Sequence, residues 1–272
     1  VQLLKFHGSY QQDNRENRKT GKGKDWQMML RLRSPGGEIP GKLFISLDEL
    51  SNKLGNGTLR ATTRQAFQMH GIRKDNLKEV IQTIVSAMGS TLAACGDINR
   101  NVMAPAAPFE KPEYKTARSL AIKVADLLTP VAGQGTFLEL WADGDLEYKI
   151  KPDKEIQENR KLQFNEHVFS GVKNEPLYGS TYLPRKFKCA VTVPGDNSVD
   201  ILTNDIGIVA FTSKEGEFEG CNFYIGGGMG RTHNNEETFA RIADPLGYVE
   251  KDDTYEFCLL YTSPSPRDGH QS

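Results

Sequence analysis

Apolar and polar residues alternate most clearly between Thr58 and Ile72, in the stretch TLRATTRQAFQMHGI. Such alternation is typical of a half-buried strand. One face, which includes Phe67 and Met69, is suited to a core. The opposite face is polar and consists of Arg60, Thr62, Arg64, Ala66, Gln68 and His70. Arginine presents a rigid fork of donors that suits carboxylates and other oxyanions, although a solvated outer face would also tolerate these residues.

The remaining pattern predicts a mixture of helices and strands. Apolar residues at helical spacing predict helices at Lys74–Met88 and Tyr114–Leu128, with shorter ones at Leu47–Leu54 and Glu236–Ala243. Strands are predicted at Val1–Tyr10, Trp26–Leu32, Phe137–Trp141, Glu147–Ile150, Lys186–Val193, Ile206–Thr212 and Cys221–Ile225. This order of elements favours an α+β fold with a largely antiparallel sheet.

Several segments lack periodicity. Gln11–Lys24 and Lys151–Pro176 are polar, and we expect irregular, exposed chain in both. Ala104–Pro112 is rich in proline and is the best candidate for an internal boundary. The composition changes abruptly after Cys258, because Leu259–Ser272 is rich in Ser and Pro. We therefore expect residues 258–272 to be a non-native tail. Because the chain begins at Val1 without an initiator Met or a targeting peptide, we expect it to be a fragment.

Composition narrows the possible functions. The 272 residues include 34 basic and 35 acidic side chains, so the net charge does not favour binding to nucleic acid or to a membrane surface. No apolar run approaches the roughly 18 residues that a membrane helix needs. The four cysteines are scattered and lack the spacing of a metal site, which favours a reducing compartment.

Two further stretches could bind an anion. Lys186 and Lys188 would leave the same face of a strand roughly 6.6 Å apart, and like charges side by side are unfavourable unless solvent or an anion offsets them. The glycine-rich stretch Gly226–Arg231 follows a strand, so its backbone N–H groups could approach an anionic ligand. A tight turn is the alternative. Arg100 lies in another irregular connection and would add a donor if it faced the same cavity.

Five motifs together resemble assimilatory sulfite reductase, most closely the ferredoxin-dependent plastid type of plants and algae, within the nitrite/sulfite reductase family. They are TTRQAFQMHG (62–71), DINRNVMAPAAP (97–108), YLPRKFK (182–188), DNSVDILTNDIG (196–207) and GGGMGRTH (226–233). The resemblance implies a ferredoxin-like half-domain at residues 1–103. A siroheme-binding domain at residues 104–257 would follow, with the C-terminal half of the family missing.

The resemblance also implies cofactors and site residues. The family reduces sulfite to sulfide with six electrons at siroheme coupled to a 4Fe-4S cluster, with ferredoxin as donor in the plastid type. By the motifs, Arg64, Lys186 and Lys188 match the basic residues that hold sulfite. The residues expected around the tetrapyrrole are Arg60, Thr62, His70, Arg100, Asn101, Arg185, Gly227, Gly228 and Arg231.

The related nitrite reductases are the first alternative. They resemble TSRQNWQ and PRKWN at the corresponding places, whereas this chain has Thr63, Ala66, Phe67 and Lys188. A second lysine suits a substrate that can carry two negative charges, so sulfite is favoured. A plastid nucleoid protein that binds DNA is the second alternative, and the basic loop Arg15–Lys24 is its only local support.

Two departures from the family matter. Bacterial members carry a further active-site arginine where this chain has Gly133–Gly135, so that role is vacant or supplied elsewhere. The C-x5-C and C-x3-C pairs that bind the cluster do not occur here. We therefore expect the fragment to be inactive alone. By resemblance, its location would be the plastid stroma.

Overall fold

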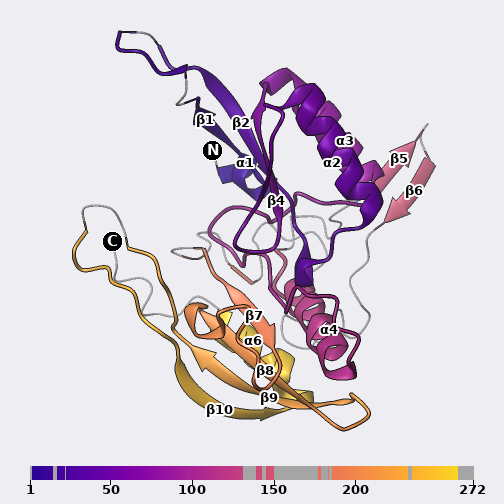
Figure 1. The fold of residues 1–272 in the computed structure, drawn as a ribbon, viewed down its shortest axis with the longest axis vertical. Helices are drawn as coiled ribbons and strands as arrows, with labels where there is room; N and C mark the ends of the chain where they lie inside the picture. Colours follow the sequence, from indigo (N-terminus) through magenta and orange to yellow (C-terminus); the bar gives the residue numbers. More distant parts are fainter. Residues whose placement is uncertain are drawn as a thin grey trace. The chain divides into compact units, whose positions relative to one another are not determined.

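The computed structural model describes the chain at residues 2–14, 17–21, 23–130, 139–142, 145–149, 177–178, 183, 186–231 and 235–262. The chain forms two compact units (Figure 1). Unit 1 consists of Val1–Ser34, Glu38–Gly96 and Leu138–Lys149. Unit 2 consists of Pro35–Gly37, Asp97–Phe137 and Ile150–Ser272. Both combine helices with mainly antiparallel strands, which confirms the predicted α+β class. The predicted domain boundary at residue 104 stays a prediction.

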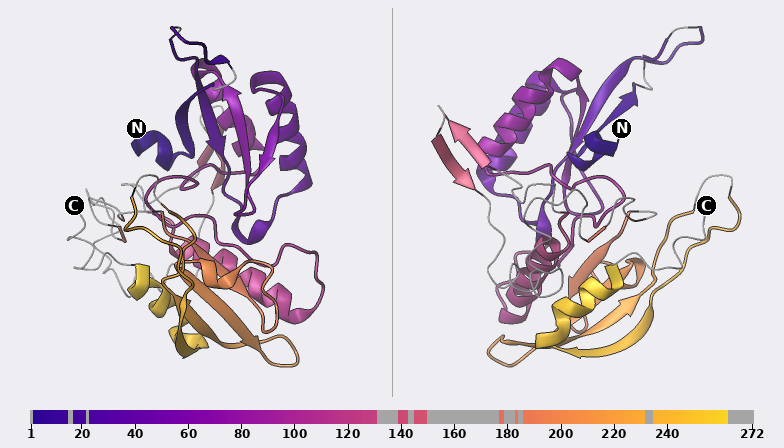
Figure 2. Two further views of the ribbon diagram at one scale, coloured as in Figure 1. Left: turned by 60° about the vertical axis from the view of Figure 1, so that its left-hand side comes forward. Right: turned by 180° about the vertical axis from the view of Figure 1, so that it is seen from behind.

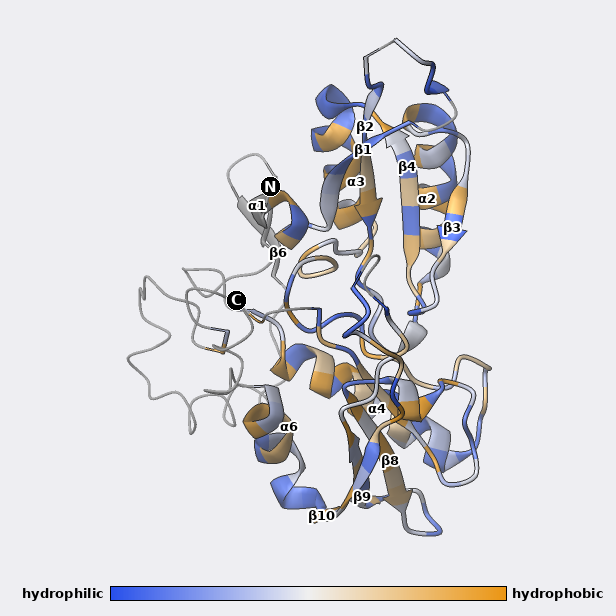
Figure 3. Cartoon of the chain, turned by 90° about the vertical axis from the view of Figure 1, so that its left-hand side faces the viewer, coloured by the Kyte–Doolittle hydropathy of each residue, from blue (hydrophilic) through white to orange (hydrophobic). Residues whose placement is uncertain are grey.

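Unit 1 is a four-stranded antiparallel sheet with order β1-β2-β4-β3. Its elements are α1 (Gln2–Phe6), β1 (Ser9–Asp13), β2 (Trp26–Arg31), α2 (Gly41–Leu54), β3 (Leu59–Ala61), β4 (Phe67–Ile72), α3 (Leu77–Ser86) and the hairpin β5 (Glu139–Ala142) with β6 (Asp145–Lys149). A 3-10 turn, Lys74–Asn76, leads into α3. Figure 3 shows bands of hydrophilic residues along β4 between apolar ones.

The core of unit 1 lies between one face of this sheet and the helices α2 and α3. Leu30 and Met69 on the strands pack with Leu47, Val80 and Ile84 on the helices, and all five side chains are fully buried. The predicted helix at Lys74–Met88 is confirmed in α3 and its leading turn, and the short predicted helix at Leu47–Leu54 is the second half of α2. Polar side chains, among them Arg31, Arg60 and Gln68, occupy paired positions outside this core.

Two strand predictions in unit 1 are wrong in detail. Val1–Tyr10 is not one strand, because Gln2–Phe6 is helical and β1 begins at Ser9. Thr58–Ile72 is a hairpin of β3 and β4 rather than one strand. The N–H of Thr62 donates to the Ala66 carbonyl (2.8 Å), and Gln65 has a positive φ of 55°, so the chain reverses at this point. Because Arg60 pairs with Gln68, the predicted polar face is nevertheless retained across the hairpin.

Unit 2 has a four-stranded sheet with order β10-β9-β8-β7, in which only the β7–β8 pair is parallel. Its elements are α4 (Pro112–Leu127), β7 (Cys189–Thr192), β8 (Ile206–Thr212), β9 (Phe218–Ile225), β10 (Asp244–Glu250) and α6 (Thr254–Thr262). The 3-10 turns Pro35–Gly37, Ile201–Thr203 and Lys251–Asp253 complete it. α4 contacts β7 and β8, and α6 contacts α4 and β10 (Figure 2).

One predicted helix in unit 2 is wrong. Residues 235–243 contain a turn followed by an isolated bridge, and β10 starts directly afterwards. The N–H of Arg241 donates to Gly228 (2.8 Å) and that of Ala243 to Leu202 (2.8 Å). Because these N–H groups bond to distant carbonyls, the segment cannot form the local hydrogen bonds of a helix.

α6 includes the first residues of the expected tail, with Leu259 and Thr262 both 1% exposed. The non-native origin of residues 258–272 stays a prediction, and the predicted irregular segment Lys151–Pro176 lies outside the described residues. Among the described helices, none is both long and apolar enough to cross a lipid bilayer.

Candidate functional site

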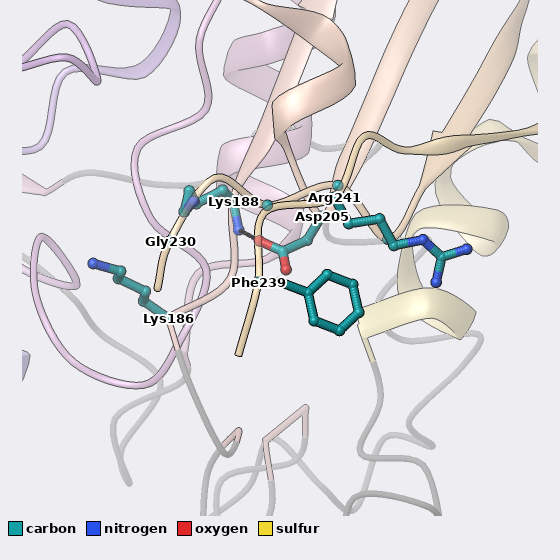
Figure 4. A pocket seen from close by; sticks show the side chains of 9 residues that line it. Lys186, Lys188, Asp205, Gly230, Phe239 and Arg241 are labelled. Atoms are coloured by element: carbon teal, nitrogen blue, oxygen red, sulfur yellow. Dashed lines mark hydrogen bonds between the residues drawn. The ribbon is translucent and has the colours of Figure 1, made fainter. Parts of the chain in front are cut away.

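Unit 2 contains an open cavity of about 300 Å³ with a strongly cationic wall (Figure 4). It is lined by Lys186, Lys188, Asp205, Gly226, Gly227, Gly228, Gly230, Phe239 and Arg241. Three of these side chains are cationic and one is a carboxylate. A cavity with this lining suits a small oxyanion or the carboxylates of a larger ligand.

The two lysines are presented by an extended segment that precedes β7. Phe187, between them, donates its N–H to the Ile98 carbonyl (3.0 Å) and accepts from the Arg100 N–H (2.7 Å). This pairing holds residues 186–188 against residues 98–100 and leaves the lysines on either side of Phe187. The predicted strand Lys186–Val193 is thus only partly regular, since β7 starts at Cys189, but both lysines do reach one cavity.

The glycine stretch forms the facing wall in a way the sequence did not predict. The N–H groups of Gly226 and Gly227 donate to the carbonyls of Asp205 and Asn204 (3.0 Å each), and that of Gly228 donates to Arg241 (2.7 Å). These groups already have partners within the chain, so a ligand role for Gly227 and Gly228 stays a prediction that depends on the close approach that glycine allows. Gly227 is required by close approach, because a Cβ there would lie 2.3 Å from the Leu202 carbonyl oxygen.

Asp205 and Arg241 are cavity residues that the sequence did not single out. The Lys188 N–H donates to Asp205 Oδ2 (2.8 Å), and the Arg241 guanidinium pairs with Asp244. In the view of Figure 4 the Asp205 carboxylate lies between Lys188 and Arg241. Asp205 was visible as part of the motif at 196–207, whereas Arg241 was hidden in the incorrectly predicted helix.

Unit 1 carries a separate polar face on its sheet. Arg60, Gln68 and His70 share this face, as the sequence predicted, and Arg31 is added because it pairs with Gln68 across β2 and β4. With its amide oxygen turned toward Arg31, Gln68 accepts from that guanidinium (2.7 Å from Nε). Its amide nitrogen then donates to His70 Nε2, and His70 Nδ1 lies 3.1 Å from Gln12 Oε1.

His70 is electrostatically constrained on this face. Partial burial is the largest cause that lowers its pKa below the ordinary value of 6.5, followed by the positive charges of Arg60 and Arg31. A neutral His70 fits the hydrogen bonds above, in which one ring nitrogen accepts and the other donates. The sequence alone did not predict which residues surround His70, because Gln12 and Arg31 come from strands that are distant along the chain.

The other predicted residues are placed as follows. Arg64 is half-buried at the β3–β4 turn, and its N–H donates to Thr62 Oγ1 (3.3 Å), which also accepts from the Ala66 N–H (3.2 Å). Asn101 is buried, and Arg100 is half-buried beside Phe187. Arg231 is exposed and does not line the cavity. Arg185 and the segment Gly133–Gly135 lie outside the described residues.

The basic loop gives the nucleic-acid alternative no support. Arg18 pairs with Asp13 (2.6 Å) and the Lys24 ammonium lies 5.0 Å from the centre of the Trp26 ring, so two of its described cations have partners within unit 1. An ion pair of this exposed kind contributes little energy, but it does reduce the free positive charge that a phosphate backbone would meet.

Comparison with known proteins agrees with both units. The family description "Nitrite/Sulfite reductase ferredoxin-like half domain" matches residues 21–87, and "Nitrite and sulphite reductase 4Fe-4S domain" matches residues 154–262. The sulfite reductase (ferredoxin) of Synechococcus elongatus is 60% identical over 256 residues, which is 94% of this chain. The chain belongs to the nitrite/sulfite reductase family. The resemblance to this family inferred from the motifs is therefore confirmed, and the plastid type stays a prediction.

Two further similar proteins show that the chain spans less than half the length of the proteins it matches. The sulfite reductase (NADPH) hemoprotein beta-component of Methylobacterium nodulans is 42% identical over 93% of this chain. The solved structure of the Mycobacterium tuberculosis NirA protein matches 95% of the chain with a TM-score of 0.57 at 22% identity, which supports the fold. The chain covers only 40% of the Synechococcus protein, and 39% of each of the other two.

Proposed function

We propose that this chain is part of a ferredoxin-dependent sulfite reductase, which reduces sulfite to sulfide with six electrons. The observation that carries the proposal is the convergence of Lys186 and Lys188 on one cavity. Two ammonium groups there would offset the charges of a doubly negative oxyanion better than one lysine and an asparagine. The 60% identity to a protein named sulfite reductase (ferredoxin) supports the same substrate and donor.

Siroheme, the iron tetrapyrrole with many carboxylates, fits the donor chemistry of the chain. Lys186, Lys188 and Arg241 line one cavity, and their cationic donors suit such carboxylates. A Cβ at Gly228 would meet nothing within 4 Å, which leaves room at the cavity wall. Once bound, the group would supply an iron centre that passes electrons to the substrate.

Each predicted residue then has a role in the proposed site. The residues that would hold the carboxylates and face of siroheme are Arg60, Thr62, His70, Arg100, Asn101, Arg185, Gly227, Gly228 and Arg231. Arg64, Lys186 and Lys188 would bind sulfite, neutralise its charge and supply protons to the oxygen atoms that leave as water. Asp205 and Arg241 would complete the charge pattern beside the lysines.

The 4Fe-4S cluster does not fit the cysteines of this chain. Cys95, Cys189, Cys221 and Cys258 are all buried, and burial raises the pKa of the Cys221 thiol to about 11 and that of Cys258 well above its ordinary value. Their positions 95, 189, 221 and 258 also lack the close spacing of a cluster-binding pair. Within the described residues no His, Cys, Asp and Glu side chains form a metal-binding group. We propose that the cluster ligands belong to the part of the family that this chain does not cover.

The proposed donor rests on the similar Synechococcus protein, and the proposed location rests on the resemblance of the motifs. Ferredoxin is the donor in the name of the Synechococcus relative, and the motifs resemble the plastid type. We therefore place the complete protein in the plastid stroma. Imaging of a fluorescent fusion of the complete native product would test that location.

Turnover of the complete protein tests the proposed function. With reduced ferredoxin and siroheme supplied, the protein encoded by the full native transcript should release sulfide from sulfite. Lys188→Asn should lower the ratio of sulfite to nitrite turnover at least about tenfold, since one charge-assisted contact is lost. Lys214, an exposed lysine of unit 2, provides the control Lys214→Asn. Unchanged selectivity in Lys188→Asn, with intact nitrite turnover, would favour the nitrite reductase alternative.

A further inference from the structure

Asp205 connects the two walls of the cationic cavity. Its carboxylate accepts the N–H of Lys188 (2.8 Å), on the lysine wall. Its backbone carbonyl accepts the N–H of Gly226 (3.0 Å), on the glycine wall. Both partners line the same cavity, as does Asp205 itself. One residue therefore fixes the spacing between the two walls.

The neighbours of Asp205 reinforce this connection. The Ile206 N–H donates to the Lys188 carbonyl (3.1 Å), so residues 205 and 206 hold both backbone groups of Lys188. The Asn204 carbonyl accepts the Gly227 N–H, and its side-chain amide donates to the Asp200 carbonyl (3.0 Å). Because Asn204 is only 1% exposed, the whole Asn204–Asp205 pair is anchored beneath the cavity.

The chemistry of Asp205 argues against a simple surface role. A carboxylate beside Lys186, Lys188 and Arg241 lowers the positive charge available to an anion, which would weaken binding if it had no other effect. Its hydrogen bond to the Lys188 N–H is charge-assisted and therefore stronger than a neutral one. The carboxylate thus orders the backbone at Lys188, although it lowers the positive charge available to an anion.

We infer that Asp205 is a positioning residue that sets the orientation of Lys188 toward the bound anion. The inference rests on the proposed function for the identity of that anion, sulfite, but the hydrogen bond itself belongs to this chain. Asp205 acts through the backbone of Lys188. Asp205→Asn, which keeps an oxygen acceptor and loses the charge, should therefore still position Lys188. An alanine should not.

The test compares Asp205→Ala with Asp205→Asn in the 272-residue chain, using sulfite as the probe in calorimetric titration. Amide exchange at the Lys188 N–H is measured by NMR in parallel. Asp205→Ala should weaken sulfite binding about tenfold and accelerate exchange at Lys188 by about the same factor, as loss of a charge-assisted hydrogen bond predicts. Asp205→Asn should bind sulfite at least as tightly as the wild type. Asp252→Asn, at an exposed aspartate, controls for net charge.

A double-mutant cycle separates positioning from a general loss of structure. In a Lys188→Ala background, Asp205→Ala should change sulfite affinity by less than about twofold, because its target is gone. A full tenfold loss in that background, or a loss in Asp205→Asn equal to that in Asp205→Ala, would overturn the inference. If the wild-type chain without its cofactors does not bind sulfite, amide exchange at Lys188 alone decides the positioning role, and turnover of the complete protein decides the proposed function. Unchanged Lys188 exchange in Asp205→Ala would then overturn the positioning role separately.

Discussion

The polar side chains Arg31, Arg60 and His70 of unit 1 stand on regular strands, whereas Lys186 and Lys188 of unit 2 precede one. In unit 1, Arg31 and His70 are held through their side chains, by Gln68 and Gln12. In unit 2, Lys186 and Lys188 are held through the backbone, by the pairing of Phe187 and by Asp205. The first arrangement fixes the direction of each donor, and the second fixes the chain while the long lysine side chains adapt.

This difference suits different tasks. A rigid guanidinium or imidazole on a strand can match carboxylates whose positions do not change. A lysine is a compact charge on a flexible stem with donors that can rotate, which suits a substrate whose shape and charge change during reduction. The comparison therefore suggests that Arg60 and His70 of unit 1 suit a rigid cofactor and that the two lysines of unit 2 suit the reacting anion. Substitutions in each unit can break or sharpen this contrast.

The largest effect is expected at the glycine wall of unit 2. Gly227→Ala would place a Cβ 2.3 Å from the Leu202 oxygen and 2.7 Å from the Asn204 oxygen, both of them backbone atoms. The wall must move, and we expect a loss of about 3 kcal/mol in the free energy of unfolding, as for an overpacked core. Sulfite affinity should fall with it. Urea denaturation and calorimetric titration measure the two effects.

Gly228→Ala is the matched control for this substitution. A Cβ at residue 228 would meet no atom within 4 Å, so stability should stay within about 0.5 kcal/mol of the wild type. Equal losses in both variants would contradict the view that backbone contacts of Gly227 build the wall.

A smaller effect is expected at the β3–β4 turn of unit 1. Thr62 Oγ1 accepts the N–H groups of Arg64 and Ala66, so the hydroxyl stabilises the turn much as a capping residue stabilises a helix end. Thr62→Ala should lower the free energy of unfolding by about 1 kcal/mol. Thr62→Ser keeps the hydroxyl and should recover most of that loss in the same denaturation experiment. If serine fails to do so, the methyl group rather than the hydroxyl matters.

The sequence predicted which side chains share a face of the sheet better than it predicted where the chain reverses direction. The polar face of Arg60, Gln68 and His70 was correct even though the single strand was wrong, because the hairpin pairs Arg60 with Gln68 and so preserves the alternation. The reversal was missed because no glycine marks it. Gln65 takes the positive φ instead, with Thr62 supplying the local acceptor.

The sequence predicted the two lysines of the cavity but not Arg241 or the backbone hydrogen bonds. Lys186 and Lys188 were identifiable from their spacing and from the family motif. The use of the glycine N–H groups by the Asn204 and Asp205 carbonyls could not be predicted, because it depends on long-range pairing. Arg241 was missed for the same reason, since its bridge to Gly228 replaces a helix that local periodicity favoured.

The smallest effect concerns the pH dependence of unit 1. The pKa of His70 in the folded chain is lowered from its ordinary value of 6.5, first by burial and then by Arg60 and Arg31. Above pH 6.5 the ring is neutral in both states and adds no penalty. As pH falls below 6.5 the unfolded chain takes up the proton first, so stability should decrease toward the folded pKa.

His70→Gln should remove that part of the decrease while keeping polar contacts with Gln12 and Gln68. The measurement is the free energy of unfolding of both proteins between pH 7.5 and pH 5.5, taken as a difference so that carboxylate titration cancels. His7→Gln, at an exposed histidine of the same unit, is the control. If wild type and His70→Gln decline in parallel, protonation of His70 costs the fold nothing. The strand-mounted cations of unit 1 would then be no more constrained than the lysines of unit 2.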